Sequence, residues 1–184
     1  PEAVARVQWL LVPRHPQRFD EVAQQLQSAG LSVARRSQWA DGPASQADVW
    51  LGDSLGEMPL YYALADVALL GGSFAPLGGQ NLIEAAACAC PVVLGPHTFN
   101  FAQAAEDACA SGAAQRVADM AQAVRAALAW VHDEAALAQA RQQAQQFAQA
   151  HQGAAQAMVE AMAQWLDGGF EDQKGLKPLL GKRE

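Results

Sequence analysis

Six short apolar runs, separated by segments with helical periodicity, constrain the fold of this chain more than any other feature. The runs are Val7–Val12, Leu31–Arg35, Asp48–Gly52, Asp66–Gly72, Pro91–Gly95 and Ala113–Val117. Most are apolar without alternation, which is typical of strands buried on both faces of a parallel sheet. Helices are expected between them at Arg18–Ala29, Gly56–Ala65, Asn81–Ala89, Asn100–Ser111 and Asp119–Val131. The sequence therefore predicts an α/β fold, a doubly wound Rossmann-like parallel sheet with helices on both faces.

One such domain is expected, followed by added helices. Residues 1–131 form the predicted Rossmann-like domain, and a chain with 51% apolar residues can bury a core. Residues 132–167 are rich in Ala and Gln and predict two helices broken near Gly153. In them Met158, Met162 and Trp165 recur at helical spacing, which favours a packing face against the domain or a missing neighbour. Residues 168–184 predict a flexible tail, with contact to an anionic membrane surface as the alternative for its basic side chains.

Charge and cysteine content exclude several classes of function. Nineteen acidic and twelve basic residues give a net charge of −7, which argues against nucleic acid as the main ligand because phosphate backbones bind positive surfaces. Cys88, Cys90 and Cys109 lack CxxC spacing and are interpreted as reduced, buried thiols of a cytosolic protein. The sequence predicts no metal site. No apolar run approaches the length of a membrane span.

Polar groups and glycines follow four of the predicted strands. Because the carboxyl ends of parallel strands meet at one edge of a doubly wound sheet, where such folds bind ligands, these groups are expected to gather there. They are Arg14, His15, Asp53, Ser54, Gly56, Glu57, Met58, Gly71, Gly72, Ser73, His97 and Asn100. Their origin in segments far apart along the chain predicts a binding site at this edge.

The stretch "GGSFAPLGGQNLIEAAA" places four glycines within nine residues, directly before a predicted helix. Gly71 and Gly72 end a strand where a side chain would block close approach of a ligand, and Ser73 offers a hydroxyl group. Gly78 and Gly79 precede the helix, whose first amide groups attract phosphate. The glycines therefore predict room for a phosphate-bearing ligand.

Asn81 and Glu84 have two interpretations. The pattern N-x-x-E at a helix start is a capping box, in which Asn81 caps the amide of residue 84 and Glu84 reaches back. Alternatively, Glu84 is the only acidic or basic residue from Gly71 to Phe101, and a carboxylate at this edge could accept both hydroxyls of a ribose. The spacing leaves both interpretations open.

Arg14 and His97 also have two interpretations each. An arginine at a strand end commonly pairs with a neighbouring carboxylate. Beside an anion site, however, the fork of donors on Arg14 suits a phosphate or a ligand carboxylate better than a lysine would. His97 is either a satisfied loop histidine or a residue of the site.

Five segments, "PRHPQRF", "GDSLGEM", "ADVALLGGSF", "GGQNLIEAA" and "GPHTFNF", resemble in that order the C-terminal half of Kdo transferases. These enzymes transfer 3-deoxy-D-manno-octulosonic acid (Kdo) from CMP-Kdo to lipid A precursors in lipopolysaccharide biosynthesis. The resemblance runs from about Leu10 to about Leu128, with Gln80 as a departure where the family often has His. It implies a GT-B glycosyltransferase with this chain as the nucleotide-sugar donor domain.

The resemblance also implies roles for single residues. Glu84 is similar to the GT-B carboxylate that holds the donor ribose. Arg14, Ser73 and the amides near Asn81 would meet the CMP phosphate or the Kdo carboxylate, and the loop Gly56–Met58 would face the cytidine. No cofactor and no metal are implied, since CMP-Kdo is a substrate.

A cleft lined by His97 and Asn100 is implied as well, facing a second domain. The family's N-terminal domain, with its membrane-anchoring segment, acceptor site and catalytic carboxylate, has no counterpart in this chain. The catalytic base, the contact with the lipid A precursor and the membrane association are therefore expected outside it. The resemblance implies that the chain is cytoplasmic and inactive alone, within an enzyme on the cytoplasmic face of the inner membrane.

Two other functions stay open. The first is the donor domain of another GT-B enzyme, a UDP-sugar transferase or a sugar 2-epimerase, which would bind uridine in place of cytidine. The second is a non-catalytic nucleotide-binding or interaction module, which the stripe of Met158, Met162 and Trp165 favours.

Overall fold

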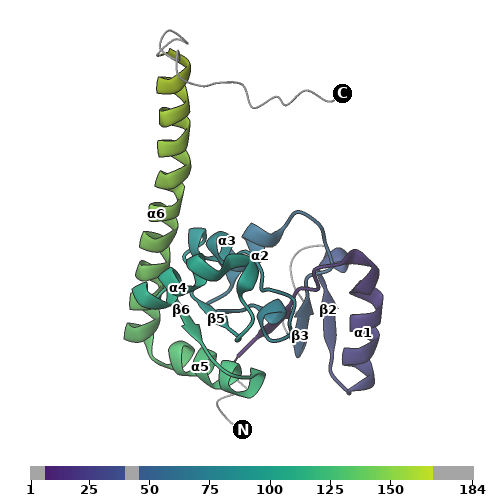
Figure 1. Ribbon diagram of the computed structural model, residues 1–184. Coiled ribbons are helices and arrows are strands. Elements are labelled where there is room, and N and C mark those ends of the chain that lie inside the picture. The colour runs from purple at the N-terminus through teal and green to yellow at the C-terminus, as the bar shows by residue number, and fades with distance from the viewer. Residues whose placement is uncertain (1–6, 40–45, 168–184) are drawn as a thin grey trace, which may run out of the picture. The chain divides into compact units, whose positions relative to one another are not determined.

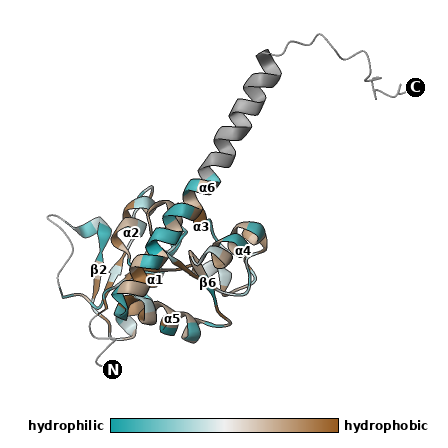
Figure 2. Cartoon of the chain, turned by 90° about the vertical axis from the view of Figure 1, so that its left-hand side faces the viewer, coloured by the Kyte–Doolittle hydropathy of each residue, from teal (hydrophilic) through white to brown (hydrophobic). Residues whose placement is uncertain are grey.

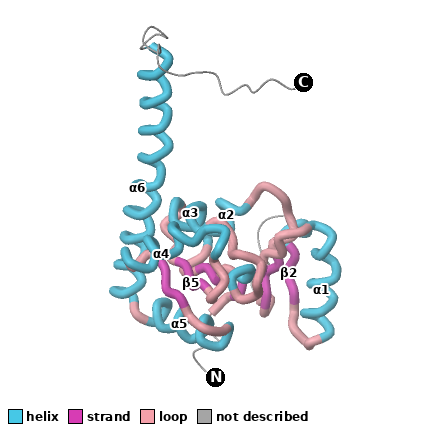
Figure 3. The backbone as a smooth tube through the Cα atoms, in the orientation of Figure 1, coloured by secondary structure: helices cyan, strands magenta, loops and turns pink. Residues whose placement is uncertain are grey.

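The computed structural model describes residues 7–39 and 46–167, with side chains as far as His151. All six predicted strands are present and shorter than expected, namely β1 (Trp9–Leu11), β2 (Val33–Arg35), β3 (Val49–Leu51), β4 (Ala68–Leu69), β5 (Val92–Leu94) and β6 (Ala114–Arg116). The five predicted helices between them are α1 (Phe19–Ser28), α2 (Met58–Leu64), α3 (Leu82–Ala87), α4 (Ala102–Ser111) and α5 (Met120–His132) (Figure 1). Single 3-10 turns are η2 (Pro16–Arg18), η3 (Arg36–Gln38), η4 (Gly71–Ser73) and η5 (Phe99–Phe101). Much of the chain between the short strands lies in loops (Figure 3).

The strands form two parallel sheets of three strands each, in the orders β1-β3-β2 and β4-β5-β6. In the first sheet, Trp50 of β3 lies opposite both Leu10 of β1 and Ala34 of β2. Parallel neighbours need a crossover connection, and α1 lies between β1 and β2, α3 between β4 and β5, and α4 between β5 and β6. The Rossmann-like α/β class is thus confirmed, while the hydrogen-bond ladder is divided into two halves.

β5 is buried on both faces, as its unbroken apolar sequence predicts. Val92 and Leu94 lie in a core that α2, α3, α4 and the start of α6 (Glu134–Asp167) cover, with Phe147 as the largest contribution of α6. Val93 points to the other face, because side chains alternate along a strand, and packs against Ala123 and Ala127 of α5. Figure 2 shows apolar residues, in brown, along the strands between the helices.

The first sheet has its own smaller core. α1 presents Val22 and Ala23 to Leu51 of β3, which has no exposed surface, and Leu26 and Val33 pack at the margin. α1 therefore covers one face of the first sheet, and the side of α1 that faces away from the sheet is exposed.

The cysteines are free thiols in the described residues. Cys90 is fully buried, and burial raises the pKa of its thiol to about 12. Cys88 and Cys109 are half-buried. Cys90 therefore packs as a small apolar residue, as predicted, and its thiol stays protonated at neutral pH.

The prediction of two helices broken near Gly153 is wrong, because α6 runs without interruption from Glu134 to Asp167. A glycine inside a helix costs about 1 kcal/mol relative to alanine, which Ala- and Gln-rich neighbours offset. The predicted packing face of Met158, Met162 and Trp165 and the predicted tail at 168–184 lie outside the part of the chain whose side chains are described. The chain divides into two compact units, Pro1–Ala148 and Gln149–Glu184, and the α/β fold lies in the first.

Candidate functional site

Ser73 joins the loops that follow β4 and β5. Its hydroxyl donates to the carbonyl of Leu70 (2.6 Å) and accepts from the amide of Gly95 (2.7 Å), while its own carbonyl accepts from the amide of His97 (2.9 Å). A side chain at Gly95 would overlap the carbonyl oxygen of Ser73, so the two segments need a glycine to meet. The expectation that Ser73 offers its hydroxyl to a ligand is corrected, because the side chain is fully buried and already bonded.

Gly78 and Gly79 serve a contact inside the protein. Both have a positive φ, +85° and +83°, which side chains rarely adopt. A β-carbon at Gly78 would overlap Nδ2 of Asn100 and lie 2.6 Å from Cε2 of Phe99, and one at Gly79 would lie 3.4 Å from the carbonyl oxygen of His97. The bare backbone at Gly78 and Gly79 makes room for the loop after β5.

Asn100 connects the loop after β5 to the loop before α3 by two hydrogen bonds. Its Nδ2 donates to the carbonyl of Leu77 (3.2 Å), and its backbone amide donates to the carbonyl of Gly78 (3.1 Å). Asn100 is exposed, and His97 is half-buried beside it. The two residues expected to line the cleft thus lie in the loop after β5, at the edge predicted from the sequence.

Gly71 and Gly72 differ in how much space they leave. A β-carbon at Gly71 would meet no atom within 4 Å, whereas one at Gly72 would touch Cγ of Gln80 at 3.4 Å. The amide of Gly72 donates to Oε1 of Gln80 (3.4 Å), and its carbonyl accepts from the amide of Gly79 (3.3 Å). Gly71 is therefore open backbone at the carboxyl end of β4.

Asn81 caps α3, although not as a capping box would. Its Oδ1 accepts from the amide of Ile83 (3.1 Å), one residue earlier than the pattern predicts, and its Nδ2 donates to Oε1 of Glu84 (3.0 Å). Glu84 does not reach back to the amide of Asn81 within the described residues. The carboxylate of Glu84 is exposed and stays accessible to a ligand.

The loop after β3 is tied to the end of β2. Glu57 accepts hydrogen bonds from the hydroxyl of Ser54, from Nη2 of Arg36 (2.7 Å) and from the hydroxyl of Tyr61 (3.3 Å). The bond from Ser54, followed by that from Arg36, holds the pKa of Glu57 below its usual value against the opposing effect of burial. Glu57 is thus occupied within the protein.

The neighbours of Glu57 differ in exposure. Gly56 has a φ of +77° and is open, because a β-carbon there would meet nothing within 4 Å. Met58 begins α2 and packs against the core of the second sheet. In the loop Gly56–Met58, which was expected to face the cytidine, Gly56 is exposed while Glu57 and Met58 are half-buried. Leu55, just before this loop, is also exposed.

A buried ion pair between Asp53 and Arg35 was missed from the sequence. Asp53 accepts from Nε of Arg35 (2.7 Å) and from the amide (2.8 Å) and hydroxyl (2.6 Å) of Ser37, and Arg35 also pairs with Asp20 (2.7 Å). Burial acts to raise the pKa of Asp53, but the bonds from Ser37 and Arg35 outweigh it and hold this pKa below its ordinary value. The signal was present, because Arg35 ends one strand and Asp53 closely follows its neighbour in the parallel sheet.

Arg14 and His15 are exposed beyond β1. Neither side chain makes a hydrogen bond or an ion pair with another described residue, so the interpretation of Arg14 as a partner of a neighbouring carboxylate gains no support. No hydrogen bond or ion pair between described residues joins the two side chains to the groups that follow β4 and β5. Among the described residues, the exposed guanidinium of Arg14 therefore has no hydrogen-bond or ion-pair partner.

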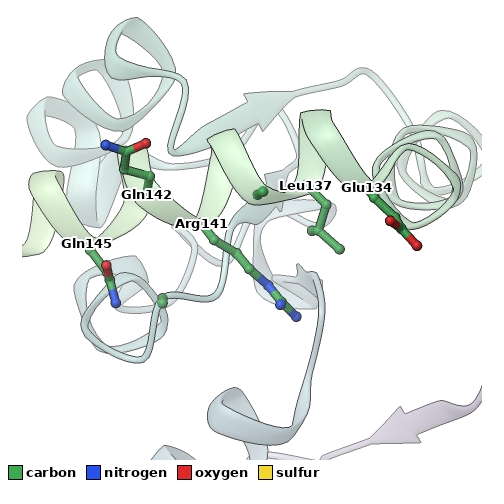
Figure 4. Close-up of a pocket in the computed structure, with 7 residues that line it drawn as sticks. Glu134, Leu137, Arg141, Gln142 and Gln145 are labelled. Carbon is green, nitrogen blue, oxygen red and sulfur yellow. The ribbon is translucent and has the colours of Figure 1, made fainter.

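The described residues form a shallow pocket on α6 and another at the end of β1. One, of about 440 Å³, is lined by Glu134, Leu137, Arg141, Gln142 and Gln145 of α6, by Ala138 and by Ala89 (Figure 4). Arg141 in this pocket is paired with Asp66. The other, of about 400 Å³, lies between the end of β1 and α1. Neither pocket is lined by a residue of the predicted site.

Within residues 7–39 and 46–167, the structure contains no group of three or more His, Cys, Asp or Glu side chains arranged for a metal ion. The described helices also include none that is long and apolar enough to cross a membrane.

Known proteins match half or more of this chain. The 3-deoxy-D-manno-octulosonic acid transferase of Bordetella pertussis is 64% identical over 121 residues, 66% of this chain and 27% of that protein. The transferase of the same description from Haemophilus influenzae is 47% identical over 92 residues, 50% of this chain and 21% of that protein. A crystal structure described as the C-terminal CMP-Kdo binding domain of WaaA from Acinetobacter baumannii superposes with a TM-score of 0.69 at 34% identity, covering 79% of each chain. No family model matches.

The fold and these matches define a Rossmann-like α/β domain of the kind found in Kdo transferases. The chain belongs to the 3-deoxy-D-manno-octulosonic acid (Kdo) transferase family, as its resemblance predicted. It matches only about a quarter of the length of the Bordetella and Haemophilus relatives, 27% and 21%.

Proposed function

We propose that this chain is the donor-binding part of a GT-B enzyme that transfers Kdo from CMP-Kdo to a lipid A precursor in lipopolysaccharide biosynthesis. The observation that carries the proposal is the likeness to the Acinetobacter domain, which is described as binding CMP-Kdo and is 34% identical across 79% of its length. Identity at this level over most of a domain supports a shared ligand more strongly than a shared fold would.

Glu84 is the group we assign to the ribose. Its carboxylate is exposed at the predicted ligand edge, and only Nδ2 of Asn81 holds it among the described residues. An ionised carboxylate accepts hydrogen bonds only, so it suits two vicinal hydroxyl groups. Gly71 supplies open backbone at the same edge, where a ligand could approach closely.

Arg14 and His15 are assigned to the anionic groups of the donor. Arg14 is an exposed guanidinium without a carboxylate partner among the described residues, and its donors fit the CMP phosphate or the Kdo carboxylate. The amide of Asn81 and the side chain of His97 are assigned to the same ligand. The cytidine would lie against the loop at Gly56. Ser73 is left out, because its hydroxyl is buried.

The remaining machinery is proposed to lie in the rest of the longer protein. Transfer requires a base that removes the proton from the acceptor hydroxyl, together with donors that stabilise the departing CMP. We assign the base, the site for the lipid A precursor and the membrane attachment to the part of the enzyme outside this chain.

Titration of the chain with CMP, followed by calorimetry, tests the proposal. We expect saturable binding that is unchanged by an excess of chelator, because amides and Arg14 can hold the phosphate without a metal. UMP serves as the matched comparison and should bind more weakly. Equal or tighter binding of UMP would favour a UDP-sugar enzyme, and loss of CMP binding with chelator would contradict the metal-free site.

A further inference from the structure

The loop before α3 is clamped by the loop after β5. Asn100 holds two successive carbonyl groups of that loop, those of Leu77 and Gly78, one through its side chain and one through its backbone. The Asn100 side chain occupies the space that a β-carbon at position 78 would need, so only glycine fits there. The positive φ of Gly78 also favours glycine. The two loops are thus fitted to each other.

The clamp is anchored to the body of the fold. Thr98 is buried, with 7% of its surface exposed, and its hydroxyl accepts from Nη2 of Arg116 (3.0 Å). Nη1 of Arg116 in turn binds Glu106 of α4 (2.6 Å). The carbonyl of Thr98 accepts from the amide of Phe101 (2.9 Å), which closes the turn η5 around Asn100. Asn100 is therefore fixed from β6 and α4.

From the clamp, contacts continue to the groups assigned to the donor. The amide of Gly79, the residue after Gly78, donates to the carbonyl of Gly72. The amide of Gly72 in turn donates to the side-chain oxygen of Gln80. Gln80 immediately precedes Asn81, and Asn81 holds the carboxylate of Glu84. Each link in this series is a hydrogen bond or a peptide bond. A shift of the Leu77 and Gly78 carbonyls is therefore transmitted along at most four residues to Asn81, which holds Glu84.

We propose that Asn100 is a positioning residue of the donor site. By holding the carbonyls of Leu77 and Gly78, it fixes the entry to α3 and with it the orientation of the Asn81–Glu84 pair. Its Nδ2 is bonded to Leu77 and acts on the ligand through Glu84. The proposal rests on the proposed function, but the clamp itself can be measured in the chain without ligand.

The test is Asn100→Ala in the 184-residue chain, a neutral change that adds no charge near an anionic ligand. In proton–nitrogen spectra recorded without ligand, we expect the amide resonances of Gly79 and Glu84 to shift. CMP affinity should fall about fivefold or more, with little change in melting temperature because Asn100 is exposed. Arg116→Lys, which keeps the charge but cannot hold Glu106 and Thr98 with a planar fork, should shift the same resonances.

The matched control is Gln115→Ala on β6, an exposed amide beside Arg116 that has no assigned role. It should leave both the Gly79 and Glu84 resonances and the CMP affinity unchanged. Unmoved resonances in Asn100→Ala would overturn the clamp, as would moved resonances with unchanged CMP affinity. A weakened affinity with unmoved resonances would make Asn100 a direct ligand contact and overturn positioning. No CMP binding by the unaltered chain would instead overturn the proposed function together with this extension.

Discussion

Nδ2 of Asn81 donates a hydrogen bond of 3.0 Å to Oε1 of Glu84, and no described residue donates to Oε2. In a capping box the glutamate would bind the amide at the start of the helix, and its carboxylate would be occupied by the fold. Here the cap is made by Oδ1 of Asn81 on Ile83, so the helix does not need the charge on Glu84. The carboxylate is therefore held in place and still exposed.

Glu84→Gln separates the two interpretations of this residue. Glutamine keeps an oxygen that can accept from Asn81, so we expect the melting temperature to change little. The loss of charge-assisted hydrogen bonds to ribose, worth about 1.5–3 kcal/mol, should weaken CMP binding at least about tenfold. Glu134→Gln, which removes the same charge from α6, is the control and should bind CMP normally. Unchanged affinity in Glu84→Gln would leave the residue as a helix-start side chain only.

Gly71→Ala tests whether a ligand approaches the open backbone after β4. An added methyl meets no protein atom within 4 Å and φ is ordinary there, so stability should be unaffected. We expect CMP affinity to fall severalfold, because the methyl occupies space on the ligand side. Gly95→Ala is the contrasting variant and should lower the melting temperature, since its methyl would lie 2.7 Å from the carbonyl carbon of Ser73. A Gly71→Ala protein with normal affinity would remove Gly71 from the site.

Ser73→Ala should destabilise the fold. The change leaves the buried amide of Gly95 without its acceptor, which costs about 1–3 kcal/mol of unfolding free energy in urea titrations. Ser111→Ala, at the end of α4, loses only a hydroxyl bond within its own helix and should change the unfolding free energy by less than about 0.5 kcal/mol. A Ser73→Ala protein of normal stability but weakened CMP binding would restore the hydroxyl to the ligand site.

Asp53→Asn should destabilise the first sheet in a pH-dependent way. The pKa of Asp53 is held below its ordinary value of 3.8, so the carboxylate stabilises the fold above that pH and loses this contribution as the pH falls through the folded-state pKa. At pH 7 we expect the unfolding free energy to fall by about 1–3 kcal/mol, because Arg35 and Ser37 lose a charged acceptor.

At a pH below 3.8, the difference in unfolding free energy between Asp53→Asn and the unaltered chain should become smaller. The reason is that the carboxyl group of Asp53 then takes up a proton when the chain unfolds. Urea titrations at neutral and acid pH measure both values. Asp107→Asn, an exposed change on α4, is the control and should follow the unaltered chain throughout. A pH-independent difference would mean that Asp53 contributes through shape alone.

The fold could be predicted because burial on both faces leaves a direct mark on the sequence. Val92, Val93 and Leu94 are apolar without alternation, and the structure buries Val93 on one side of β5 and its neighbours on the other. The continuity of α6 through Gly153 could not be predicted, because a glycine indicates a weak point while neighbouring residues decide whether the helix continues.

The site was predicted in part. The sequence identifies the edge, because residues after parallel strands must gather there, but it does not tell which partner each polar atom takes. Ser73 and Asn100 have donors that suit a ligand, but the Ser73 hydroxyl is engaged by Leu70 and by the sequence-distant Gly95. The Asn100 side chain is engaged by the carbonyl of the sequence-distant Leu77. Gly71 and Gly78 look alike in the sequence, yet one faces open space and the other faces Asn100. Such assignments depend on tertiary contacts that no local pattern encodes.

Transfer activity gives the last prediction. If this chain is only the donor part, it should bind CMP and yet form no Kdo-lipid product above background from CMP-Kdo and a lipid A precursor. The physical reason is that an acceptor held in line with the donor and a base that removes its proton together supply most of the rate, and both are assigned to the rest of the enzyme. The full-length Bordetella pertussis transferase, 64% identical over the matched 121 residues, is the positive control under the same conditions. Robust transfer by the 184-residue chain would place the base and the acceptor site within it, and the donor-part assignment would then be wrong.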